Sequence, residues 1–133
     1  MIFVDTSAFY ALVDESDKNH KQAVSTYEKF ARRQTPLITT NHIMGETYTI
    51  VMARLGAKIA LQVFENLTES RLLEKVHVSE GIEEKAFQIL KKHSDKSYSF
   101  VDAVSFAFME SKGLKKAFAF DKHFTQAGFK RIS

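Results

Sequence analysis

Short apolar runs rich in β-branched residues alternate along the chain with longer segments in which apolar residues recur at helical spacing. Residues 2–5 form the first such run and predict a strand. A helix is expected over residues 6–13, with the hydroxyl of Thr6 or Ser7 as its N-cap. After a polar stretch, apolar positions three and four residues apart predict a second helix over residues 20–34.

The same order of elements recurs in the following part of the chain. A second β-branched strand is predicted over residues 36–40, and Asn41 is a suitable N-cap for a helix over residues 41–55. Gly56 would end that helix, and a partner helix over residues 57–68 would fold back on it.

The second half of the chain continues the alternation. Its expected elements are a short strand within residues 71–78, a helix over 79–93 capped by Ser79, a helix over 99–112, a strand over 116–120 and a last strand over 129–132. Strands separated by helices predict an α/β fold with a mainly parallel sheet of four to five strands and helices on both faces.

Length and composition limit what this fold can contain. A chain of 133 residues, 44% of them hydrophobic, fits a single domain over residues 1–133 with one sizeable core. The sequence has no cysteine, which excludes disulfides and thiolate metal sites. No basic leader precedes the first strand and no apolar run is long enough to span a bilayer. The sequence therefore predicts a soluble, untargeted protein of the cytoplasm.

The net charge of +3 is too small to indicate a nucleic-acid partner by itself. The basic residues concentrate in the C-terminal segment, residues 112–133, where Asp121 is the single acid. A solvated face explains this concentration as well as a phosphate-binding surface does.

Two carboxylates interrupt the apolar pattern of the second half. Asp102 opens a nearly all-apolar helix, and Asp121 closes an apolar strand. Asp5 also follows a strand directly, and the carboxyl ends of parallel strands share one edge of a sheet. An ionised group beside a core needs a cation or hydrogen bonds to compensate its burial. These acids are therefore candidates for one common site.

Glu46 is a fourth acid of this kind, because it lies within the apolar stripe of its helix, three residues after Ile43 and four before Ile50. Four carboxylates brought together would repel one another and take up protons unless a divalent cation lay among them. Oxygen donors, without a histidine pair at helical spacing, favour Mg²⁺ or Mn²⁺ over Zn²⁺. Such a site suits phosphodiester hydrolysis by metal-activated water.

Purely structural roles are open for each acid. The Asp5 carboxylate could be a helix N-cap, although Thr6 or Ser7 could take that role instead. Asp102 lies three residues after Ser99, at the spacing of a capping box. Glu46 could be an inward carboxylate satisfied by a core hydroxyl.

Four segments carry a resemblance to a known family: VDTS at residues 4–7, TTNHIMGET at 39–47, SFVDAVSFAFME at 99–110 and AFDKHF at 119–124. Their order and spacing resemble a PIN domain, most closely the VapC-type toxin ribonucleases of prokaryotic toxin-antitoxin pairs. The resemblance covers essentially the whole chain. It implies a PIN-like three-layer sandwich and a Mg²⁺- or Mn²⁺-dependent endoribonuclease that leaves a 5′-phosphate and a 3′-hydroxyl. The implied catalytic and metal-binding acids are Asp5, Glu46, Asp102 and Asp121, the last of which reaches the metal through water in some members.

The resemblance also implies partners and supporting residues. The partners are RNA, an antitoxin whose disordered tail would place an Arg among the carboxylates, and a second copy in a homodimer. A hydroxyl of Thr6 or Ser7 would orient water or phosphate, with helix capping as an equal alternative. Asp95 could support Asp102, but a solvated loop acid is the favoured interpretation. For His123, a helix start or packing is favoured over RNA contact.

Two other functions compete with RNA cleavage. A PIN-like module could bind RNA or a partner without cutting, although the four acids argue against this. A phospho-receiver signalling domain has a similar length and sheet, but it would need paired acids after the first strand, where Asp5 is followed by Thr6 and Ser7. The scattered glycines form no phosphate-binding loop. The pattern does not indicate which RNA would be the target.

Overall fold

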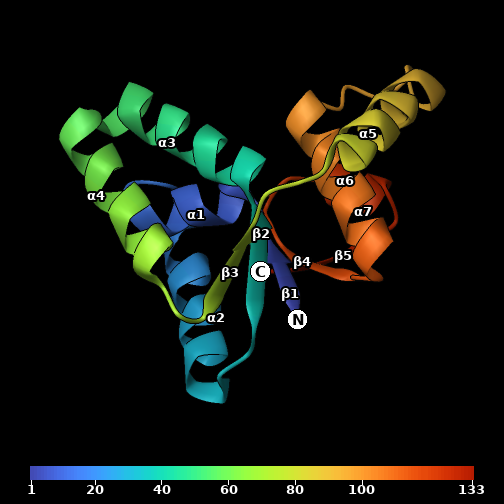
Figure 1. Cartoon of the computed structure of the whole chain (residues 1–133). Helices are drawn as coiled ribbons and strands as arrows, with labels where there is room; N and C mark the ends of the chain where they lie inside the picture. Colours follow the sequence, from blue (N-terminus) through green and yellow to red (C-terminus); the bar gives the residue numbers. More distant parts are fainter.

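A five-stranded parallel sheet forms the centre of the protein in a computed structural model that describes residues 1–133 (Figure 1). The strand order is β3-β2-β1-β4-β5, and every neighbouring pair is parallel. The strands are β1 (Ile2–Val4), β2 (Leu37–Thr40), β3 (Leu73–Val76), β4 (Lys116–Phe118) and β5 (Lys130–Ile132). The predicted α/β fold and its five strands are confirmed.

Helices cover both faces of this sheet. Figure 1 shows the first four helices on one side and the last three on the other. The first group is α1 (Thr6–Val13), α2 (His20–Arg33), α3 (Asn41–Leu55) and α4 (Ala57–Glu69), and the second is α5 (Glu80–Lys92), α6 (Phe100–Lys112) and α7 (His123–Gln126). None of the seven helices has the length and apolar character needed to cross a membrane.

The structure corrects the predicted helix starts. Asp5 caps α1, because its extended backbone lets the carboxylate accept a hydrogen bond from Ser7 N, so the N-cap is neither Thr6 nor Ser7. Thr40 caps α3, and the Asn41 side chain instead accepts a hydrogen bond from Val78 N. The short helix α7 was not predicted, since four residues are too few to show a period.

The core lies between the sheet and its helices and is rich in phenylalanine. Phe3, Phe118 and Phe124 are fully buried, and Phe3 packs at 6.1 Å from the rings of both Phe108 and Phe124. Strand β1 lies in the middle of the sheet, with β2 on one side and β4 on the other. The chain continues from β1 to β2 and later returns to the other side of β1 as β4. Sheets of this topology bind ligands beyond the carboxyl end of such a strand.

Candidate active site

A cavity of about 500 Å³ opens at the carboxyl edge of the sheet, where β1 and β4 end. All four predicted acids line it, together with Thr6 and Ser7. The remaining lining residues are Tyr10, Asp17, Asn19, Ile50, Arg54, Ser97, Ser99, Phe120 and His123. The fold therefore brings together residues that are far apart in the sequence.

Asp5 lies at the inner end of this cavity and is 5% exposed. Its Oδ2 atom accepts hydrogen bonds from Ser7 N at 3.1 Å and from Ser7 Oγ at 2.6 Å. Ser7 Oγ in turn accepts a hydrogen bond from Phe120 N at 2.9 Å. Ser7 thus joins the residues that follow β1 to those that follow β4, while Oδ1 of Asp5 has no hydrogen bond within the protein.

Replacing Ser7 by Ala should lower the free energy of unfolding by about 1–2 kcal/mol, because Phe120 N and Asp5 Oδ2 both lose a partner. Urea unfolding measures this effect. Ser16→Ala is the matched control, since Ser16 Oγ bonds only to the Asp14 carboxylate in an exposed loop. We expect the control to change stability by less than about 0.5 kcal/mol. Equal losses in both variants would contradict the clamping role of Ser7.

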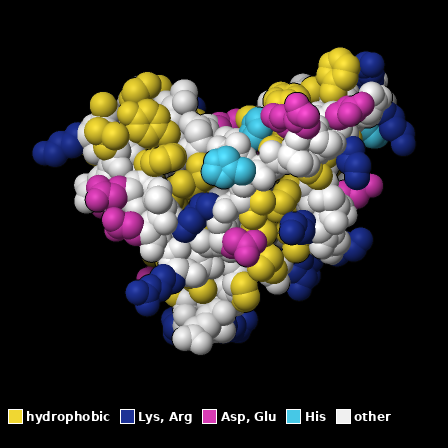
Figure 2. Space-filling model, viewed as in Figure 1, with side chains coloured by type: hydrophobic (Ala, Val, Ile, Leu, Met, Phe, Trp, Pro, Cys, Tyr) yellow, Lys and Arg dark blue, Asp and Glu magenta, His cyan; other side chains and the backbone are white.

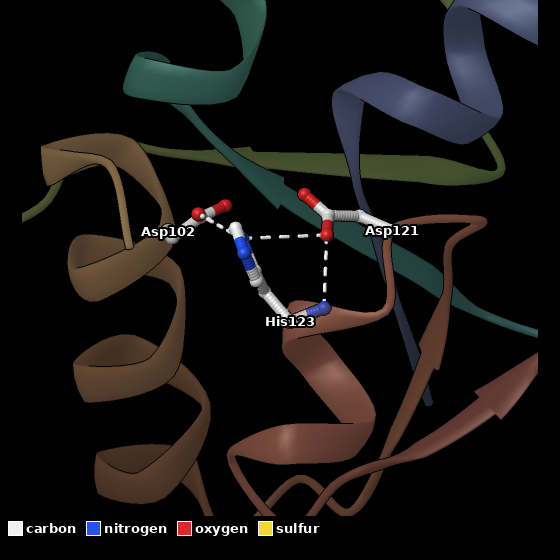
Figure 3. Close-up of side chains that lie close together, drawn as sticks. All are labelled: Asp102, Asp121 and His123. Carbon is white, nitrogen blue, oxygen red and sulfur yellow. Dashed lines mark hydrogen bonds and ion pairs between the residues drawn. The ribbon is translucent and has the colours of Figure 1, made fainter. Parts of the chain in front are cut away.

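His123 joins Asp102 and Asp121 (Figure 3). His123 Nδ1 lies 2.9 Å from Asp102 Oδ2 and 3.4 Å from Asp121 Oδ1, and His123 N donates to Asp121 Oδ1 at 2.8 Å. Because an ionised carboxylate only accepts hydrogen bonds, Nδ1 of His123 is the donor in this contact when Asp102 is ionised and no metal is bound. The start of α7 therefore fixes the positions of both carboxylates.

The capping box that the sequence allowed for Asp102 is formed. Ser99 N donates to Asp102 Oδ2, and Asp102 N donates to Ser99 Oγ, each at 3.0 Å. The Asp102 carboxylate nevertheless lines the cavity, and its Oδ1 atom has no hydrogen bond. Helix capping and a place in the site are compatible, because they use different oxygens.

Glu46 reaches the cavity from α3 and is only partly buried. Its carboxylate forms no ion pair, and the Thr6 hydroxyl is close enough to lower its pKa. Beside it, Thr6 is 5% exposed, and its Oγ1 atom is buried without a hydrogen-bond partner. The Thr6 hydroxyl is therefore a polar group beside the Glu46 carboxylate that makes no hydrogen bond of ideal geometry.

The electrostatics of the cavity favour protonation of Asp5 and Glu46 in the absence of a cation. The pKa of Asp5 is raised from 3.8 to about 7, chiefly by burial; the hydrogen bonds from Ser7 offset part of this rise, and the charges of Glu46 and Asp102 add to it. Burial also raises the pKa of Glu46; the Thr6 hydroxyl lowers it in part, and the charges of Asp102 and Asp121 raise it by smaller amounts. No Lys or Arg forms an ion pair with any of the four acids.

The residues present fit a divalent metal ion. Asp102, Asp121 and His123 each offer a ligand atom, and these atoms lie within 4.8 Å of one another. Oxygens of Asp5, Asp102 and Glu46 without hydrogen bonds line the same cavity. Hard oxygen donors suit Mg²⁺ or Mn²⁺, and their repulsion disappears when a cation binds.

The structure changes the roles that the sequence predicted for some residues of the site. Asp95 is exposed, pairs with Lys96 at 3.7 Å and does not line the cavity. His123 both starts α7 and contacts two of the acids, so its position two residues after Asp121 was a signal for the site. Sequence reasoning missed Tyr10 and Arg54, which also line the cavity.

The sequence matches the PIN domain family over residues 2–130. The chain belongs to this family.

Relatives of this PIN domain include named endonucleases. The "23S rRNA-specific endonuclease VapC20" of Mycobacterium tuberculosis is 39% identical over 132 residues, covering 99% of this chain and 98% of the relative. A "VapC ribonuclease" of Archaeoglobus fulgidus is 27% identical and covers 92% of this chain and 78% of the relative.

Solved structures share the fold. The crystal structure of the Mycobacterium tuberculosis VapC20, described as a "Sarcin-Ricin loop cleaving toxin", superposes with a TM-score of 0.91 at 37% identity, covering 99% of this chain and 98% of that one. A chain of the DNA-bound VapBC structure from Salmonella typhimurium gives a TM-score of 0.71 at 14% identity over 99% of this chain and 98% of that one.

Proposed function

We propose that this protein is a metal-dependent endoribonuclease, the toxin of a type II toxin-antitoxin pair. The convergence of Asp5, Glu46, Asp102 and Asp121 on one cavity carries the proposal, because no lysine or arginine pairs with any of them. The relatives named as endonuclease and ribonuclease support RNA as the substrate class. A PIN-like module that binds without cutting would have no need of four acids in one cavity.

The residues of the chain divide the work of the site. A bound Mg²⁺ or Mn²⁺ would neutralise the carboxylates and the phosphate and lower the pKa of a water molecule, which makes it a nucleophile at neutral pH. Asp5, Glu46 and Asp102 would hold the ion, and Asp121 would bind it directly or through water. Ser7 fixes the Asp5 carboxylate, and His123 fixes Asp102 and Asp121. The Thr6 hydroxyl would orient the water or a phosphate oxygen.

Cleavage of RNA with Mg²⁺, with Mn²⁺ and with chelator tests the activity. We expect cleavage with either metal, none with chelator, and products that carry a 5′-phosphate and a 3′-hydroxyl. Cleavage that persists in chelator, or a 2′,3′-cyclic phosphate product, would contradict attack by an activated water.

The target that we propose is the sarcin-ricin loop of 23S rRNA. The support is the name and title of the Mycobacterium tuberculosis relative, which this chain matches over nearly its full length. Incubation with intact ribosomes, followed by primer extension across 23S rRNA, locates the cut. A cut outside that loop, or in transfer or messenger RNA alone, would leave the nuclease proposal intact and contradict this target.

An antitoxin and a second copy of the chain are the partners that we propose. Figure 2 shows apolar side chains gathered over α3 and α4, and the exposed apolar residues of these helices are Met52, Ile59, Leu61 and Phe64. A surface of this kind favours binding to protein. Expression alone and together with the neighbouring gene product, followed by light scattering, tests both partners. A harmless monomer that binds no neighbour-encoded protein would contradict this proposal.

A further inference from the structure

Arg54 is the single lysine or arginine that lines the acidic cavity. It lies in the last turn of α3, eight residues after Glu46, and both residues line the cavity together with Ile50 between them. Residues four apart share a helix face, and eight residues extend about 12 Å along the axis. One face of α3 therefore carries a carboxylate at the acidic cluster and a cation farther along the same cavity.

The guanidinium of Arg54 stacks on the ring of Tyr10. Its central carbon lies 5.0 Å from the centroid of the Tyr10 ring, and Tyr10 itself is only 6% exposed. The Tyr10 hydroxyl donates to Asp14 Oδ2 at 2.5 Å, which fixes the ring at its far end. Stacking on an aromatic face orients a guanidinium and leaves the N–H groups at its edge free to bind an anion.

Arg54 forms no salt bridge with any acid of the protein, although five acidic residues line the same cavity. Asp14 attracts Arg54 electrostatically without a salt bridge, and the oxygens of Asp14 accept hydrogen bonds from Tyr10, Ser16 N and Ser16 Oγ. The guanidinium is thus oriented and lacks an ion pair.

We infer that Arg54 binds a backbone phosphate of the RNA next to the phosphate that is cut, and this inference rests on the proposed function. A polyanion that enters a cavity of carboxylates needs a cation to hold it there. A planar guanidinium binds phosphate through two parallel hydrogen bonds, and its distance along α3 places it away from the acids that would hold the metal. Arg54 is in this account a positioning residue.

Steady-state cleavage of an RNA oligonucleotide tests the inference. We expect Arg54→Gln to raise KM roughly tenfold with little change in kcat, and Arg54→Lys to recover part of the loss. Arg33→Gln is the matched control, because Arg33 is exposed at the end of α2 and does not line the cavity. Thermal unfolding of each variant shows that folding is retained. An unchanged KM in Arg54→Gln, or an equal rise in the control, would overturn the inference.

Binding provides a readout that does not depend on cleavage. In an Asp5→Asn background, a labelled single-stranded RNA is titrated at several KCl concentrations with and without Arg54→Gln. Loss of one phosphate contact should reduce the slope of log affinity against log salt by about 0.7. If the protein cleaves RNA but Arg54→Gln leaves this slope unchanged, the role of Arg54 is overturned and the nuclease proposal stands; the same holds if Arg54 binds an acidic protein segment instead of RNA. If the protein cleaves no RNA but Arg54→Gln reduces the slope, the nuclease proposal is overturned and the phosphate contact of Arg54 stands. Absence of RNA binding would overturn both.

Discussion

Asp5→Asn and Asp102→Asn are each expected to reduce RNA cleavage on the order of a thousandfold, because each removes a charged ligand from the proposed metal site. Asn preserves the shape of both side chains. At position 5 it is as good an N-cap as Asp, and at position 102 its amide oxygen can still accept the hydrogen bond from Ser99 N. Loss of activity without loss of folding therefore reports the negative charge rather than the helix caps.

Asp95→Asn is the control for these two variants, since Asp95 is an exposed acid a few residues before Asp102 and outside the cavity. Initial rates of RNA cleavage at saturating Mg²⁺ measure the effect, and thermal unfolding checks each fold. Cavity variants that cut as fast as the wild type would show that the site is assigned wrongly. A comparable loss in Asp95→Asn would show that the effect is not specific to the cavity.

Stability in chelator is expected to fall as the pH rises from about 5.5 to about 7.5. Burial raises the pKa of Asp5 from 3.8 to about 7 in the folded protein, so between these values the folded state keeps a proton that the unfolded state has lost. The unfolding free energy therefore decreases with pH in this window and levels off above about 7. Asp5 alone contributes a loss of about 2 kcal/mol over this range, and the raised pKa of Glu46 acts in the same direction.

Mg²⁺ should remove most of this decrease, because a bound cation stabilises the ionised carboxylates. Asp5→Asn should remove most of it in chelator as well, since its amide does not titrate, whereas Asp95→Asn should behave like the wild type. Urea unfolding at several pH values, with chelator and with Mg²⁺, measures the effect. A metal-free protein whose stability rises over this pH range would contradict the proposed burial of these acids.

The convergence of the four acids on one cavity could be predicted because these acids are visible exceptions to a regular pattern. Asp5 and Asp121 follow apolar strands, and Glu46 lies within the apolar stripe of a helix. In a parallel sheet such positions share one edge, so local patterns were enough to place them together. The same regularity gave the order of strands and helices.

The helix caps and the outer cavity could not be predicted in this way. The choice between Asp5 and the hydroxyls after it depends on the backbone angles at Asp5, φ −93° and ψ 160°, which the residue types alone do not determine. The contacts of His123 depend on a helix of four residues. Arg54 lies at the end of α3, and only the packing of that helix against α1 brings it over Tyr10.

The central claim is that Asp5, Glu46, Asp102 and Asp121 together hold the metal ion that cleavage requires. Crystals of the protein grown with Mn²⁺ test it most directly, because anomalous scattering locates the ion without reference to activity. The account predicts a peak in the cavity at the carboxyl ends of β1 and β4, within direct or water-mediated contact of these carboxylates. Mn²⁺ bound only elsewhere, or a cavity that holds no ion at saturating Mn²⁺, would contradict it.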